Sequence, residues 1–248
     1  MIEKLQHLVL VRHGESEGDV RRKAWQQGKT FSSDKIPEEE ELTLLGYEQS
    51  AISGEWIKNN ILLGGFAIKA FKASFVSSVL RTEQSALAMD LPNSLWQEDP
   101  RLNERNRGLI KGITKNQHQT DFPASYQQMI NDPIAWCPPE GESIIDVANK
   151  LTDFYLDIQI TSSVIVAGHR DSMWAFMKPV EGLSYEQLRQ VDTDKIDNGQ
   201  IWHYTSIDPN TGEQAPKLLW KQSINPSLES QPTNWQKLDE ANNQEFVN

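Results

Sequence analysis

Residues 11–20, VRHGESEGDV, continue the apolar run Leu8 to Val11 and place an arginine and a histidine at its end. The run is short and rich in branched aliphatic residues, which is typical of a buried β-strand. A cationic side chain beside a titratable one at the end of a strand indicates an anion site. Gly14 and Gly18 would let the following loop approach that anion closely. Asp19 does not fit this interpretation, because a carboxylate repels an anion.

Two further runs have the same character, and each also ends at cationic or titratable side chains. Residues 73–76 precede Arg81, and residues 164–167 precede His169 and Arg170. In open α/β sheets, ligands bind outside the carboxyl ends of the parallel strands. The sequence therefore predicts that the side chains at these three strand ends meet at one rim, where they suit a phosphate dianion. The residues expected there are Arg12, His13, Arg81 and His169.

Helical patterns lie between these strands. Thr43 is expected to cap a helix whose buried face carries Leu44, Leu45, Ala51, Ile52, Trp56 and Ile57. Ser143 is expected to cap a helix over 144–158, with Asp146 completing a capping box, and Ser77 or Ser78 to cap the helix of Arg81. This alternation predicts a three-layer α/β/α sandwich with a mainly parallel sheet, a single domain over residues 1–224.

The rest of the chain gives weaker signals. Residues 199–207 and 217–224 are expected to add edge strands, and the polar residues 225–248 to form a tail with little packed structure. The acidic run 38–41 predicts a solvated loop, and the basic run 21–23 a solvated helix face.

Composition narrows the class of partner. The net charge of −11 argues against nonspecific nucleic-acid binding, yet a local cationic pocket for a small phosphorylated substrate remains compatible with it. The single cysteine, Cys137, excludes an internal disulfide and a cysteine-based zinc cluster. No apolar stretch approaches the length of a membrane span. We therefore expect a cytoplasmic protein that binds neither nucleic acid nor membrane; the sequence indicates no particular oligomeric state.

Six segments occur in the order found in a known family: VRHGES, LTLLGYEQS, SSVLRTEQSA, RLNERNRGLIKG, EGES and VAGHRDS. Together they resemble the histidine phosphatase superfamily, and most closely its phosphoglycerate-mutase-like branch. The resemblance runs from about Leu8 to about Ser172. It implies a metal-independent enzyme of the histidine acid phosphatase type, without a cofactor.

The resemblance also implies a role for each residue. His13 is similar to the nucleophile that becomes phosphohistidine, Arg12 and Arg81 to phosphate ligands, and His169 to the second histidine that hydrogen-bonds the phosphoryl group. Glu104 resembles the proton donor for the leaving oxygen, which then acts as a base. The structural alternatives are a buried His13 without a chemical role and a Glu104 that only bridges Arg101 or Arg107.

Three hypotheses for the function follow, and two of them differ in the molecule that accepts the phosphoryl group. The mutases grip a phosphoglycerate with cations on a long insertion, whereas residues 113–143 hold one lysine and no arginine. This favours a phosphomonoesterase, with a lid or specificity segment at about 113–139; phosphoglycerate mutase is the alternative. A phosphate-binding regulatory module with weak or no turnover is the third hypothesis.

Two departures from the family pattern motivate the third hypothesis. Asp19 stands where the family usually has asparagine, and Arg170 where glycine commonly follows the second histidine. An ionised Asp19 at about 4 Å would repel a phosphate dianion by a few kcal/mol. We therefore expect either that Arg170 pairs with Asp19 and contributes to substrate binding, or that both side chains point away from the pocket.

Overall fold

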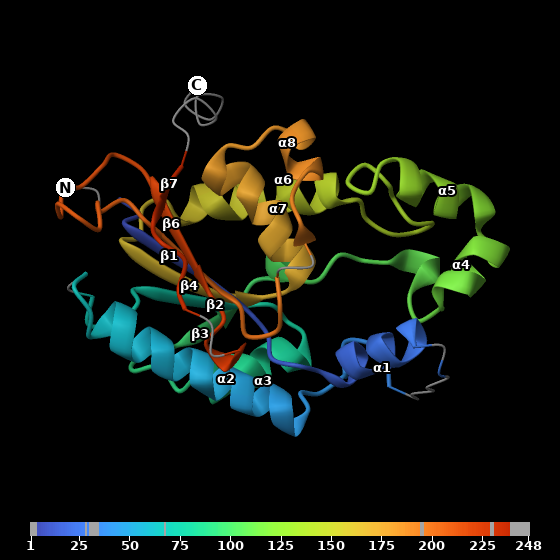
Figure 1. Cartoon of the computed structure of the whole chain (residues 1–248), viewed down its shortest axis with the longest axis horizontal. Coiled ribbons are helices and arrows are strands. Elements are labelled where there is room, and N and C mark those ends of the chain that lie inside the picture. The colour runs from blue at the N-terminus through green and yellow to red at the C-terminus, as the bar shows by residue number, and fades with distance from the viewer. Residues whose placement is uncertain are drawn as a thin grey trace.

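The computed structural model describes residues 4–27, 29, 35–66, 68–193, 196–228 and 231–238. Its centre is a seven-stranded sheet in the order β3-β2-β4-β1-β5-β6-β7 (Figure 1). The strands are β1 His7–Arg12, β2 Ala73–Val76, β3 Trp96–Glu98, β4 Ser163–Gly168, β5 Ile201–Thr205, β6 Trp220–Ile224 and β7 Gln236–Lys237.

The three strands predicted at the outset lie together and run parallel. In the register of the sheet, Val11 of β1 and Val76 of β2 both pair with Ala167 of β4. The carboxyl ends of these strands therefore reach the same rim, as predicted. The last three strands are antiparallel, and β5 lies inside the sheet between β1 and β6. The expectation that β5 and β6 would be edge strands is wrong, because β6 continues the sheet beyond β5 and β7 continues it beyond β6.

Helices cover both faces of the sheet, which confirms the α/β/α sandwich. In Figure 1, α6, α7 and α8 lie on one side of the sheet and α2 and α3 on the other. The helices are α1 Glu17–Gln26, α2 Leu44–Ile57, α3 Leu80–Ala88, α4 Lys115–Asp121, α5 Pro123–Asn131, α6 Ile144–Ile158, α7 Arg170–Glu181 and α8 Tyr185–Arg189. A π-helical turn, Lys58–Leu62, follows α2, and short 3-10 turns span Pro100–Leu102, Gly108–Ile110 and Pro226–Leu228.

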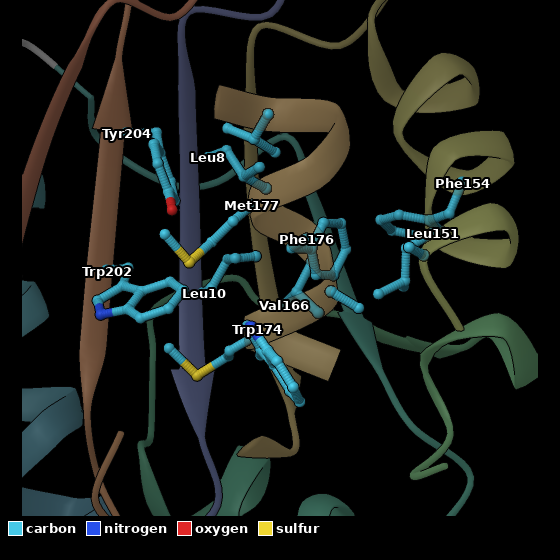
Figure 2. Packing of buried hydrophobic residues seen from close by; sticks show 14 of the residues in the cluster. Leu8, Leu10, Leu151, Phe154, Val166, Trp174, Phe176, Met177, Trp202 and Tyr204 are labelled. Atoms are coloured by element: carbon cyan, nitrogen blue, oxygen red, sulfur yellow. The ribbon is translucent and has the colours of Figure 1, made fainter. Parts of the chain in front are cut away.

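The strand β1 contributes side chains to two hydrophobic cores, one on each face of the sheet. Leu8 and Leu10 belong to the cluster under α6 and α7, where Phe154 and Phe176 pack (Figure 2). Val9 belongs to the cluster under α2 and α3. Successive side chains of a strand point to opposite faces, so a continuous apolar run is what a strand covered on both faces requires.

The helix α6 forms as predicted. Ser143 caps it, its hydroxyl accepting from the Asp146 amide, and the Asp146 carboxylate accepts from the Ser143 amide. The six predicted core positions of this helix are buried: Ile144, Val147, Ala148, Leu151, Phe154 and Ile158.

The helix α2 begins after Thr43 as expected, but its predicted buried face is wrong except at Ile57, which is buried. Leu44 is 90% exposed, whereas the buried positions of the helix are Gly46, Ser50, Ser53, Gly54 and Ile57. The cause is a close backbone approach: a Cβ on Gly54 would lie 2.0 Å from the Met89 carbonyl oxygen. Apart from Ile57, the buried positions of this helix are therefore small residues.

Part of the predicted tail is packed. Asn225 is buried and donates to the Asn198 carbonyl, and the Trp235 ring lies 5.2 Å from that of His203. The strand β7 then pairs with β6, and Leu238 is buried. The expectation of little packed structure after residue 224 is therefore wrong for these residues, because two apolar side chains anchor them; residues 229–230 and 239–248 lie outside the described chain. No helix in the described part of the chain is long and apolar enough to cross a membrane.

Candidate active site

A cavity of about 1150 Å³ opens at the rim where β1, β2 and β4 end, between α1 and the segment from Pro100 to Asn116. Six of the seven candidate residues line it: Arg12, His13, Asp19, Arg81, Glu104 and Arg170. The seventh, His169, is fully buried and contacts both Arg81 and Glu104. The structure therefore brings together residues from five separate parts of the sequence.

His13 follows β1 directly and is 3% exposed. Its Nδ1 lies 2.7 Å from the Gly14 carbonyl oxygen. A carbonyl only accepts, so Nδ1 carries the proton and Nε2 keeps its lone pair. Burial lowers the pKa of His13 to about 3; Arg81 and Arg12 lower it too, against the opposing charge of Asp19. The imidazole is therefore neutral near pH 7, as a nucleophile requires.

Gly14 is needed for a different reason from the one expected. A Cβ at this position would lie 2.0 Å from the carbonyl oxygen of Gly46 in α2. The loop after β1 thus makes room for a helix rather than for an anion. Gly18 likewise lies against the carboxylate of Glu40, which a Cβ would meet at 2.1 Å.

Asp19 is buried and paired. Its carboxylate accepts from Arg12 at 3.0 Å, from Arg22 at 2.7 Å and from Asn198 at 3.0 Å. Burial opposes ionisation of Asp19, yet His13, Arg12 and Arg22 hold its pKa well below the ordinary value. The predicted ion pair with Arg170 is therefore wrong, and so is the alternative that both residues avoid the cavity.

Asp19 also begins the helix α1. Its carboxylate accepts from the amide and hydroxyl of Ser16, and the Ser16 side chain accepts from the Asp19 amide. This is a capping box, and the spacing Ser-x-x-Asp in the quoted stretch was its signal. Sequence reasoning missed it, and it missed Arg22 as a cavity residue.

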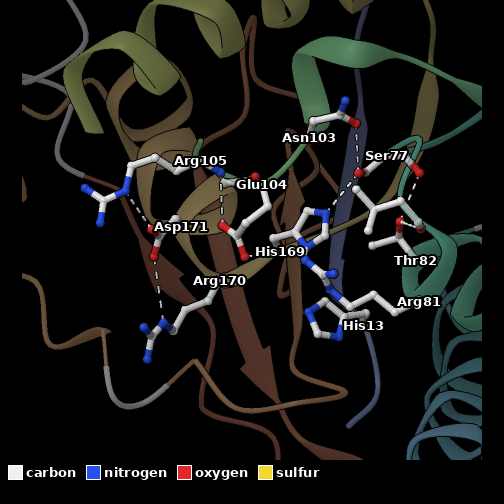
Figure 3. Close-up of polar contacts among 12 residues, drawn as sticks. His13, Ser77, Arg81, Thr82, Asn103, Glu104, Arg105, His169, Arg170 and Asp171 are labelled. Atoms are coloured by element: carbon white, nitrogen blue, oxygen red, sulfur yellow. Dashed lines mark hydrogen bonds and ion pairs between the residues drawn. The ribbon is translucent and has the colours of Figure 1, made fainter. Parts of the chain in front are cut away.

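Arg81 and His169 meet beside His13 (Figure 3). Arg81 Nη2 lies 3.3 Å from His169 Nδ1. Because guanidinium only donates, His169 Nδ1 accepts and Nε2 carries the proton. That proton goes to the Ser77 hydroxyl at 2.9 Å, which in turn donates to Asn103 Oδ1 at 3.0 Å. Ser77 therefore fixes the tautomer of His169.

The predicted serine cap of α3 is wrong. Val79 occupies the N-cap position of α3, without a side-chain hydrogen bond. The Ser77 hydroxyl is engaged with His169 and Asn103 instead, and the Ser78 amide donates to Asn103 Oδ1.

Glu104 faces the same histidine. Its Oε2 lies 3.6 Å from His169 Nδ1. Burial and the charge of Asp171 raise the pKa of Glu104, while Arg81, Arg107 and Arg170 oppose that rise. Glu104 does not bridge Arg101 or Arg107, which pair with other acids: Asp99, Asp157 and Asp171.

Asp171 lies among a second group of arginines, of which only Arg170 was predicted as a substrate-binding residue from the sequence. Its carboxylate lies 3.0 Å from Arg105, 2.7 Å from Arg107 and 3.8 Å from Arg170. Figure 3 shows Arg105 and Arg170 converging on Asp171 next to Glu104. The only signal was the acidic residue that directly follows His169-Arg170 in the sequence.

The acidic run 38–41 is not simply solvated. Glu40 is 3% exposed and pairs with Arg21, so the predictions of a solvated loop and a solvated helix face are wrong at these positions. Glu38 pairs with Lys111, and both residues line the cavity. Within the described residues, no group of three or more His, Cys, Asp or Glu side chains could hold a metal ion.

Comparison with known proteins gives one family. Residues 8–211 match the family described as "Histidine phosphatase superfamily (branch 1)". A 2,3-bisphosphoglycerate-dependent phosphoglycerate mutase from Bartonella tribocorum is 27% identical over 192 residues, covering 73% of this chain and 84% of that mutase.

Solved structures share the fold. A mycobacterial glucosyl-3-phosphoglycerate phosphatase superposes with a TM-score of 0.64 at 19% identity, covering 81% of this chain and 90% of that one. A putative alpha-ribazole-5'-P phosphatase from Escherichia coli gives a TM-score of 0.63 at 18% identity, covering 86% and 96%.

Proposed function

Because the chain belongs to branch 1 of the histidine phosphatase superfamily, we propose that it is a metal-independent phosphomonoesterase that transfers a phosphoryl group through His13 to water. The observation that carries this proposal is the neutral His13, its Nε2 lone pair unused by Gly14, beside the guanidinium groups of Arg12 and Arg81. A neutral imidazole between cations combines a nucleophile with a site for the phosphoryl oxygens.

In the first step, His13 Nε2 attacks phosphorus and the bond from phosphorus to the ester oxygen breaks. Arg12 and Arg81 offset the charge on the phosphoryl oxygens, and His169 holds Arg81 in place by accepting a hydrogen bond from it. Glu104 gives its proton to the leaving oxygen; its raised pKa favours the protonated form that this step needs. The products are phosphohistidine and an alcohol.

In the second step, the Glu104 carboxylate takes a proton from water. The oxygen of that water forms a bond to phosphorus, the bond from phosphorus to His13 breaks, and inorganic phosphate leaves. Glu104 is then protonated again, so the cycle closes without another group.

Water is favoured as acceptor because the segment 113–139, which we assign as a lid, brings few cations to the cavity. Lys115 is the cation of that segment among the lining residues. Phosphoglycerate mutase remains the alternative, supported by the similarity to mutases at 27% identity. The hypothesis of a phosphate-binding module with weak or no turnover was motivated by the charge of Asp19. That argument no longer supports it, because Arg12 and Arg22 neutralise Asp19.

The test is release of phosphate from p-nitrophenyl phosphate and from a panel of phosphorylated metabolites, beside a coupled phosphoglycerate mutase assay. We expect hydrolysis that His13→Ala lowers by about 1000-fold or more. His118→Gln is the control, since His118 lies outside the cavity lining. Mutase turnover without hydrolysis would favour the alternative; hydrolysis that survives His13→Ala would refute the proposal.

A further inference from the structure

The charges that line the cavity fall into two groups on either side of Glu104. The first group lies at His13 and sets Arg12, Arg22 and Arg81 against the single carboxylate of Asp19. Its surplus of positive charge matches the phosphate dianion of the proposed reaction. The second group has the same composition, with three arginines and one carboxylate.

The second group is Arg105, Arg107, Arg170 and Asp171. All three guanidinium groups lie within 3.8 Å of the Asp171 carboxylate, which is 6% exposed. One carboxylate neutralises one guanidinium, so this cluster also carries surplus positive charge. The side chains of Arg107 and Arg170 are 34% and 26% exposed and line the cavity, so a ligand can reach them.

Most other cations of the cavity wall have an acid each. Arg21 pairs with Glu40, Lys111 with Glu38, and Lys150 with Glu142. Lys115 lies over the ring of Tyr126. The uncompensated charge is therefore concentrated at His13 and at Asp171 rather than spread over the wall.

Arg105 provides an independent sign that an anion is expected there. It is 6% exposed, its guanidinium lies over the Trp136 ring, and its Nη1 has no hydrogen-bond partner among the described residues. A buried cation with an unfilled donor is costly. A nearby anion would offset that cost electrostatically even if only Arg107 and Arg170 touch it.

We propose that the leaving alcohol of the substrate carries a second anionic group, a carboxylate or a phosphate, which Arg107 and Arg170 bind. The inference rests on the proposed phosphomonoesterase function. In Figure 3, Arg170 and Asp171 lie on the far side of Glu104 from His13. A substrate with one anion at each cluster therefore presents its ester oxygen to Glu104. Guanidinium forks bind carboxylate and phosphate in a bidentate manner, and Asp171 and Arg105 act as positioning residues.

The test compares three esters at fixed ionic strength: glycerol 3-phosphate, 3-phosphoglycerate and propane-1,3-diol bisphosphate. We expect kcat/KM for at least one of the two doubly anionic esters to exceed that for glycerol 3-phosphate by about tenfold or more, since charged hydrogen bonds contribute on that scale. Whichever doubly anionic ester has the larger kcat/KM relative to glycerol 3-phosphate shows whether the second site prefers a carboxylate or a phosphate. Arg107→Gln and Arg170→Gln are each expected to lower this ratio to about two, and Arg170→Lys to an intermediate value.

Arg189→Gln is the matched control. Arg189 pairs with Asp132 and Glu186 outside the cavity, so the ratio should stay as in the unaltered protein. A ratio near one in the unaltered protein, or one that neither glutamine variant changes, overturns the inference.

Binding separates this inference from the proposed reaction. The same three esters are titrated into the His13→Ala variant by calorimetry, where no turnover is needed. A preference for the doubly anionic esters that Arg170→Gln removes supports the second site even if no ester is hydrolysed. Hydrolysis without any such preference leaves the reaction standing and refutes the second site.

Discussion

The carboxylate of Asp19 lies 3.0 Å from the guanidinium of Arg12 and at the same time closes the capping box of α1. The Asp19 side chain thus holds Arg12 in place and stabilises the first turn of α1, the helix that forms one wall of the cavity. An acid favours that position, because the N-terminal end of a helix is positively polarised. Asp19 therefore links the strand β1 to α1, and the two arginines that pair with it offset most, but not all, of its repulsion of phosphate.

Asp19→Asn is expected to tighten the binding of inorganic phosphate about fivefold or more. Asparagine can still cap α1, but the negative charge beside the phosphate site is gone. The measurement is the inhibition constant of phosphate as a product inhibitor. Asp153→Asn, an exposed change on α6, is the control. Weaker phosphate binding would mean that Asp19 matters mainly by holding Arg12 in place.

The pH dependence of kcat/KM should show a basic limb set by Glu104. The pKa of His13 is lowered to about 3, so the nucleophile stays neutral down to low pH. The pKa of Glu104 is raised, chiefly by burial, and the first step needs its protonated form. Activity should therefore fall as the pH rises through the pKa of Glu104.

Glu104→Gln tests that assignment. The variant should lose most activity toward esters with poor leaving groups. Its residual rate should no longer fall as the pH rises through the pKa of Glu104. A variant that keeps the whole profile of the unaltered protein would contradict the role of Glu104.

Ser77→Ala is expected to lower kcat/KM about tenfold while the protein stays folded. The change removes the acceptor of the His169 Nε2 proton, so the tautomer that accepts from Arg81 is no longer fixed. Steady-state kinetics give the effect, and thermal unfolding checks the fold. Ser94→Ala is the control, because the Ser94 hydroxyl has no hydrogen-bond partner in the described structure. Equal kinetics in the two variants would refute the role of Ser77.

Gly14→Ala is expected to destabilise the protein by about 3 kcal/mol, since its Cβ would overlap the Gly46 carbonyl and force the loop away from α2. Urea unfolding measures the loss. Gly65→Ala serves as the comparison, because a Cβ there meets nothing within 4 Å. If both variants unfold at the same urea concentration, the close approach does not constrain the loop.

The sequence predicts the strands and their shared rim because each strand is a local pattern of apolar residues. The capped helix α6 is predictable for the same reason: its cap and its periodicity lie within 16 residues. The buried face of α2 is not, since Gly46 and Gly54 face inward to admit backbones from distant segments. Hydrophobic periodicity carries no information about such contacts.

Within the candidate site, the residues at strand ends could be found, but their partners could not. Arg22 and Arg12 reach Asp19, and Arg107 reaches Asp171 from 64 positions away. Which of many possible acids pairs with an arginine depends on the tertiary arrangement. The predicted pairing of Asp19 with Arg170 failed for this reason, although the Ser16 capping box would have placed Asp19 correctly.

The helices α4 and α5 pack chiefly against each other, to one side of the sheet and across from α1 (Figure 1). Such an appendage can be exchanged between relatives without disturbing the strands that deliver His13 and its cations. Natural variation in these two helices can therefore change what the cavity admits while the strand ends at His13 stay the same, and a chimera carrying a foreign 115–131 segment should fold and bind phosphate.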